Sequence, residues 1–182
     1  PYHYALMSSG LPEFLDLARV TRQPLERAGR IRIGKMSRLR EMLSDSDSDS
    51  EVQVHVYAQD DGSGQVVVRG EAQAELTLVC QRCLKPMQQH ISADFRLVWV
   101  RNEREANAIQ DESCDPLLSA EGRIKLAELI EDELLLALPI AALHEVDRCE
   151  ASAPEPETQA VEPEPPAKQN PFAVLEQLKR HR

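Results

Sequence analysis

Four side chains of types that bind metal ions lie in two pairs along the sequence. Cys80 and Cys83 form a Cys-x-x-Cys motif, and His144 and Cys149 form the second pair. Two thiolates at the first spacing can both reach one Zn²⁺ from a tight turn, at metal–sulfur distances of about 2.3 Å. Three cysteines with one histidine are a recognised ligand set of structural zinc sites. We therefore predict that these four residues converge in the fold and hold a structural zinc ion.

Two other interpretations of Cys80 and Cys83 stay open. A redox-active pair is typical of a Cys-x-x-Cys motif at the start of a helix in a β-α-β unit. Here Lys85 and Pro86 follow the motif, and the pattern after them predicts another strand. The third interpretation is a pair of reduced thiols packed at a strand end, since a free cysteine behaves as a small buried apolar residue. Cys114 has no partner at metal-binding spacing and is not expected to take part.

Motifs of the common enzyme classes are missing from the sequence. It contains no phosphate-binding loop, no glycine-rich dinucleotide turn, no Gly-x-Ser-x-Gly and no His-Glu-x-x-His. We therefore predict a protein that is not an enzyme and that has no small-molecule substrate.

Alternating apolar residues predict the strands that position the Cys-x-x-Cys motif. Residues 52–56 alternate valines with polar residues, and a turn is predicted over 60–64. A long strand over 66–80 carries the motif at its end, and another strand covers 91–100. The short connections between these strands favour an antiparallel sheet. Further strands are predicted over 25–33 and, at an edge, over 115–118.

The clearest predicted helix spans 124–138 and ends just before Pro139. Its apolar residues share one face, which can cover the sheet. A shorter helix is predicted over 36–43. The predicted fold class is therefore α+β, an antiparallel sheet packed against a C-terminal helix, over residues 11–149. We interpret four carboxylates of the long helix as a solvated acidic face, because no His or Arg is interleaved; they are Glu128, Glu131, Asp132 and Glu133.

The composition changes after this domain. Residues 150–169 hold five prolines and five glutamates and almost no bulky apolar side chain, which predicts a disordered, extended linker. Asn170 and Pro171 then suit the cap and first turn of a helix over 170–182. A tethered amphipathic helix typically docks on a partner, and the alternative is that it folds back on its own domain. The predicted docking residues are Phe172, Leu175 and Leu178.

Charge is distributed unevenly along the chain. The net charge of −10 disfavours polyanions, yet between Arg19 and Arg40 lie eight basic residues and one acid, a local charge of +7. This segment predicts a nucleic-acid contact. The alternative is that its arginines pair with acidic groups of the same molecule. The predicted contact residues are Arg19, Arg22, Arg27, Arg30, Arg32, Lys35, Arg38 and Arg40.

The sequence contains no run of about 18 apolar residues, so no membrane span and no membrane partner are predicted. Residues 1–10 lack the apolar centre and cleavage signal of a secretory leader. We expect them to be a disordered or foreign extension and leave them out of the fold prediction. A cytoplasmic location follows as the expectation, in which cysteines remain thiols or metal ligands rather than disulfides.

Several segments, taken in order, carry a resemblance to a known family. They are Leu76–Cys83 (Leu-Thr-Leu-Val-Cys-Gln-Arg-Cys), the stretch Glu131–Pro139, the His144 and Cys149 pair, and Asn170–Leu175 (Asn-Pro-Phe-Ala-Val-Leu). In these segments the chain resembles the bacterial YceD family, the large ribosomal RNA subunit accumulation proteins, over roughly Leu11 to Arg182. Some members of that family carry a cysteine where this chain has His144, and a histidine can also ligate zinc.

The resemblance implies a role in the accumulation of 23S ribosomal RNA, and so in ribosome biogenesis, without catalytic activity. The expected partners are large-subunit rRNA, a ribosomal protein or another assembly factor. Two alternatives stay open. One is a zinc- or thiol-dependent redox enzyme that uses Cys80 and Cys83, and the other is a protein-only adaptor whose basic segment meets an acidic partner.

Overall fold

The computed structural model describes residues 11–20, 23–44, 50–109, 111, 113–145 and 148–149. The predicted linker 150–169 and docking helix 170–182 lie outside these residues, as do residues 1–10. The elements are, in chain order, β1 (Phe14–Asp16), η1 (Leu17–Arg19), β2 (Leu25–Arg32), η2 (Ile33–Lys35), α1 (Ser37–Met42), β3 (Glu51–Asp60), β4 (Val66–Val79), β5 (Pro86–Val100), α2 (Glu103–Ala106), β6 (Asp115–Leu118), β7 (Arg123–Lys125) and α3 (Leu126–Ala137).

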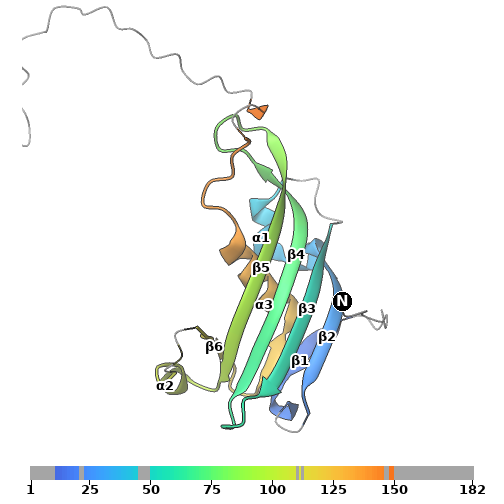
Figure 1. Ribbon diagram of the computed structural model, residues 1–182. Coiled ribbons are helices and arrows are strands. Elements are labelled where there is room, and N and C mark those ends of the chain that lie inside the picture. The colour runs from blue at the N-terminus through green and yellow to red at the C-terminus, as the bar shows by residue number, and fades with distance from the viewer. Residues whose placement is uncertain are drawn as a thin grey trace, which may run out of the picture. The chain divides into compact units, whose positions relative to one another are not determined.

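A five-stranded sheet in the order β2-β3-β4-β5-β6 is the main layer of the domain (Figure 1). The first four strands pair antiparallel with their neighbours, as predicted. The edge strand β6 pairs parallel with β5, which the sequence prediction did not include. The reason is that residues 101–114 carry the chain back along the sheet before β6 begins. The fold class is α+β, with a mixed rather than a purely antiparallel sheet.

The core lies on one face of this sheet. Side chains alternate between buried and exposed along β3, β4 and β5, because successive residues of a strand point to opposite faces. Figure 1 shows α1 and α3 on the same side of the sheet, and the buried residues of α3 pack against those of the strands. These helix residues are Leu126, Leu129, Ile130 and Leu134.

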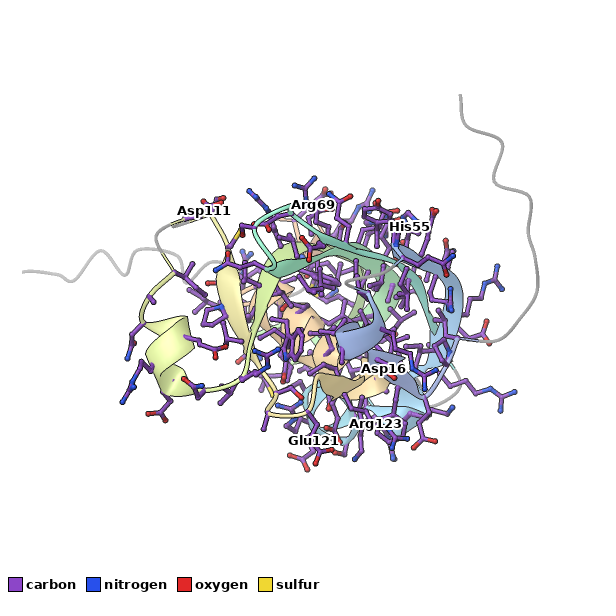
Figure 2. The ribbon with its side chains drawn as sticks, turned by 90° about the horizontal axis from the view of Figure 1, so that it is seen from below. Asp16, His55, Arg69, Asp111, Glu121 and Arg123 are labelled. Carbon is purple, nitrogen blue, oxygen red and sulfur yellow. The ribbon has the colours of Figure 1, made fainter. Side chains whose placement is uncertain are left out.

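A second, two-stranded sheet joins the two ends of the domain. Its strands β1 and β7 pair antiparallel, with Leu15 opposite Ile124. The predicted helix over 124–138 therefore starts later, at Leu126, because the residues before it are used as a strand. Figure 2 shows Asp16, Glu121 and Arg123 on one side of the domain and His55, Arg69 and Asp111 on the other.

The prediction that the carboxylates of α3 form a solvated face is wrong for Glu131, which is 3% exposed. Its Oε1 atom accepts hydrogen bonds from the backbone N–H groups of Arg38 and Leu39, at 2.7 and 3.0 Å. Its Oε2 atom accepts a bond from Nη2 of Arg38 at 3.0 Å. These backbone donors belong to the first turn of α1, where N–H groups have no partner within the helix. One carboxylate therefore fastens α1 to α3.

The described residues include no helix that is long and apolar enough to cross a membrane.

Glu131→Gln should destabilise the domain by about 2–3 kcal/mol, because a neutral amide replaces a buried carboxylate that accepts several hydrogen bonds. Denaturant unfolding measures this change. Asp132→Asn is the matched control, since Asp132 binds the same Arg38 at 2.6 Å but with both side chains about half exposed. It should change stability little, because surface ion pairs contribute little. Equal effects of the two substitutions would contradict this role of Glu131.

Candidate metal centre

The Cys-x-x-Cys motif lies in the turn that joins β4 to β5. The two strands pair as far as Val79 and Pro86, and the backbone N–H of Cys80 then donates to the carbonyl oxygen of Lys85 at 2.9 Å. The N–H of Leu84 donates back to the carbonyl oxygen of Cys80 at 2.8 Å. Leu84 has a φ of 58°, a left-handed conformation that lets the chain turn back within these few residues. The turn thus brings both cysteines to one end of the hairpin.

The segment after α3 passes beside this turn. The backbone N–H of Gln81 donates to the carbonyl oxygen of Ala142 at 2.8 Å, and Nη2 of Arg82 donates to that of His144 at 3.1 Å. Pro139 ends the helix, and the chain continues from there to the tip of the hairpin (Figure 1). His144 and Cys149 are therefore carried to the Cys-x-x-Cys turn.

The structure brings the four predicted metal ligands together. The ligand atoms of Cys80, Cys83, His144 and Cys149 all lie within 4.8 Å of one another. Nδ1 of His144 is 3.3 Å from Sγ of Cys83. Four ligands arranged tetrahedrally at about 2.3 Å from a zinc ion are separated by about 3.8 Å. The observed spacing therefore fits a single four-coordinate ion after small side-chain adjustments.

Cys80 is placed so that its sulfur can carry negative charge. Burial of this side chain works against ionisation, but hydrogen bonds from the backbone N–H groups of Cys83, His144 and Arg82 outweigh it and lower the pKa of Cys80 to about 5. The N–H of His144 lies 3.5 Å from Sγ. A thiolate supported in this way is the form that binds a metal ion.

The thiol of Cys83 lies close to two other sulfurs, which disfavour its ionised form. The backbone N–H of Lys85 favours the thiolate of Cys83, yet burial and the neighbouring sulfurs of Cys80 and Cys149 together raise the pKa of Cys83. A divalent cation would remove this conflict, because its charge favours the ionised form of every sulfur around it. Three sulfurs and one imidazole, all supplied by the chain, match the ligand set of a structural zinc site.

The structure divides the predicted basic residues into two groups. Arg19 pairs with Asp16 at 2.9 Å, Arg30 with Glu51 at 3.4 Å, and Arg38 with Glu131 and Asp132. A second group of exposed cations has no acidic side-chain partner among the described residues; it consists of Arg27, Arg32, Lys35 and Arg40. Arg22 and the docking residues Phe172, Leu175 and Leu178 lie outside the described part of the chain.

Two features of the metal centre were missed by the sequence prediction. The motif gives no role to Arg82, whose Nη2 atom donates to the carbonyl oxygen of His144. The backbone N–H groups around Cys80 leave no sequence signal, because every residue except proline has one. Cys114 lies apart from this centre, in a small apolar cluster with Val67, Val98 and Val100, as expected for a residue that is not a ligand.

Comparisons with known proteins agree on one family. The family model described as large ribosomal RNA subunit accumulation protein YceD matches residues 68–179, which include the four candidate ligands but not β2 or α1. A curated protein of that name from Haemophilus influenzae is 39% identical over 116 residues, or 63% of this chain and 66% of the relative. The match thus covers slightly less than two thirds of the relative's length. No solved structure matches the chain.

We expect the purified protein to bind about one zinc ion per chain, because the four ligands form a single site. Cys80→Ser and Cys149→Ser should lose most of the metal, as measured by elemental analysis of the folded protein. A chelator should lower the melting temperature by several degrees, because metal binding stabilises the folded state. Cys114→Ser is the control and should keep its metal. Full metal content in the Cys80→Ser variant would rule out this site.

Proposed function

Because this chain belongs to the YceD family of large ribosomal RNA subunit accumulation proteins, we propose that it supports the accumulation of 23S rRNA without being an enzyme. On this proposal it acts in the cytoplasm, where ribosomes are assembled, and binds large-subunit rRNA directly. A ribosomal protein or another assembly factor can share the contact.

The observation that carries the proposal is the set of exposed cations on β2, η2 and α1, of which Arg27 and Arg32 point to opposite faces of the edge strand. Arg27 and Arg32 lie on the edge strand β2, Lys35 ends η2, and Arg40 lies on α1. Among the described residues they form no ion pair, although Glu51 lies opposite Arg32 in the pairing of β2 with β3. In a chain with a net charge of −10, exposed cations without an ion pair favour a polyanionic partner. Phosphate groups of RNA are such a partner.

The candidate metal centre supports a structural role rather than a catalytic one. All four positions around a zinc ion would be filled by Cys80, Cys83, His144 and Cys149. A catalytic zinc site needs a position left open for water or substrate. On this proposal the ion only fastens the segment after α3 to the tip of the hairpin.

A redox function of Cys80 and Cys83 is the second candidate, and the lowered pKa of Cys80 favours it. A reactive cysteine must also be reached by its substrate, whereas Cys80 is fully buried. The test is thiol–disulfide exchange of the metal-free protein with a small disulfide. A rate well above that of the Cys80→Ser variant would favour the enzyme over the assembly factor.

Binding to large-subunit rRNA fragments should weaken with salt, because each phosphate contact releases counterions. Replacing Arg27 and Arg32 with Gln should lower the slope of log affinity against log salt by roughly 1–2, since about 0.7–0.9 is expected per lost contact. Anisotropy titrations at several salt concentrations measure this slope. The matched control is Arg101→Gln with Arg104→Gln, which removes the same charge from another exposed surface.

An unchanged slope in the β2 variant, or an equal loss in the control, would contradict an RNA contact at this edge. Recovery of a ribosomal protein or assembly factor without any rRNA binding would instead favour the protein-only adaptor.

We also propose, from the sequence alone, that residues 170–182 dock on a partner through Phe172, Leu175 and Leu178. The composition of 150–169 predicts a tether that lets this segment reach a surface away from the domain. Truncation after Gln169 should leave the melting temperature nearly unchanged but lower large-subunit rRNA levels in cells and partner recovery. A much lower melting temperature would show that the segment belongs to the core. Unchanged rRNA levels and recovery would also contradict the proposal.

A further inference from the structure

A cavity of about 330 Å³ lies on the face of the main sheet that is opposite the core. Ligand pockets of proteins begin at about this size. The strands β3, β4 and β5 form its floor, and the connection between β5 and β6 forms one wall. Figure 2 shows Arg69 and Asp111, which both line the cavity, on this side of the domain. Val67 on β4 and Val98 on β5 lie in the lining from the sheet, and Ala108 and Ile109 lie in it from the connection.

The wall of the cavity is fixed to the sheet. Ala106 and Ile109 pack on a small cluster of buried residues that includes Val98 and Cys114. Nη1 of Arg96 donates to Oγ of Ser113 at 2.8 Å, and Nη2 pairs with Asp111 at 3.3 Å. The connection therefore has apolar and polar attachments to the outer face, and the cavity is a built feature of the fold.

An aromatic ring and two guanidinium groups form a row beside this cavity. Tyr57 on β3 is opposite Arg69 on β4, and Arg69 is opposite Arg96 on β5. Residues paired in this way point to the same face and are neighbours. Two like charges directly opposite each other are unfavourable in a sheet. Asp111 already pairs with Arg96 at 3.3 Å, so Arg69 is the cation of this row that a further anionic group would contact.

The nearby carboxylates are already used by other groups. Asp61 accepts hydrogen bonds from the backbone and the hydroxyl group of Ser63, and Asp111 binds Ser113 and Arg96. Arg69 has neither an ion pair nor a side-chain hydrogen bond among the described residues. The next row of the sheet holds Glu71 opposite Asp94, and Asp111 neutralises Arg96, so Arg69 is the cation of this row that is left for an anionic ligand.

With the rRNA-binding role proposed above as its premise, we propose that this row and cavity hold one unpaired nucleotide of RNA. Arg69 binds the phosphate of this nucleotide, and the base enters the cavity against Val67 and Val98. An adjacent base stacks on Tyr57. Unpaired bases stacked on aromatic rings and contacted along their edges are the usual target of sequence-specific RNA recognition.

The amide groups at the cavity supply the contacts to the edge of the base. The hydroxyl group of Tyr57 donates to Oε1 of Gln59 at 2.8 Å, which leaves the NH₂ group of Gln59 as a donor. Gln65 is exposed at the mouth and offers both a donor and an acceptor. A free nucleotide offers the same phosphate and base as a nucleotide within RNA, so binding of the two must be compared.

The test uses the full chain and fluorescent single-stranded RNA pentamers of each single base. Anisotropy should show a preference for one base. Ala108→Phe, which places a ring at the lining of the cavity, should weaken binding of the preferred pentamer by roughly tenfold, as expected for the loss of one stacked or enclosed base. Arg69→Gln should weaken all pentamers. Asn107→Phe is the matched control, because Asn107 is exposed and next in sequence but does not line the cavity.

Wild-type binding of every pentamer by the Ala108→Phe variant would overturn the inference. Equal binding of a nucleoside monophosphate and the pentamer would assign the cavity to a free nucleotide and overturn the link to RNA. Arg27→Gln with Arg32→Gln should lower the affinity for rRNA fragments without changing the base preference. Loss of that affinity with no effect of Ala108→Phe would leave the proposed function standing and reject only the cavity. Absence of any rRNA binding by the wild-type protein would reject both.

Discussion

The antiparallel pairing of β4 with β5 is the constraint on which the rest of the structure depends. It runs over thirteen residue pairs, from Val67 opposite Val98 to Val79 opposite Pro86. The Cys-x-x-Cys turn is at one end of this hairpin, and the row of Tyr57, Arg69 and Arg96 is near the other. Eleven residues of extended chain separate Arg69 from Cys80, a distance of about 35 Å. Charges at the two ends are thus screened from each other by salt. The hairpin therefore links the two sites through its rigid geometry and not through electrostatic interaction.

The strands and the long helix were predictable because their signals are local. Alternation with a period of two marks β3, β4 and β5, and the same residues that alternate in the sequence alternate in burial. The pairing of β1 with β7 had no such signal. Each strand has three residues, and Leu15 meets a partner, Ile124, that lies far away in the sequence. The parallel direction of β6 depends on the path of residues 101–114, which no periodicity describes.

The candidate metal centre was predictable for a different reason. Cys80 was expected at the end of a strand, and His144 and Cys149 just beyond the helix that covers the sheet, so the predicted topology already brought them together. The positions of charged residues in the sequence said less about their environment. A sequence does not distinguish a carboxylate that is buried against backbone donors from one that is exposed to water. Glu131 and Asp132 are adjacent, yet one is 3% exposed and the other about half exposed. The same limit applies to the basic segment, in which only the structure separates Arg38 from Arg40.

The pairing of β1 with β7 can form only after a long stretch of the chain between them has been synthesised. Phe14 leaves the ribosome early, but Lys125, its partner, is translated 111 residues later. At about 5–20 residues per second this interval is roughly 6–20 s. During that time β1 has no partner strand for its backbone groups. Cys80 and Cys83 likewise lack two of the four candidate ligands until His144 and Cys149 have been synthesised. The β2–β5 meander can form meanwhile, because each of its strands pairs with the next. The chain therefore spends several seconds as an open sheet whose apolar face has no cover from α3.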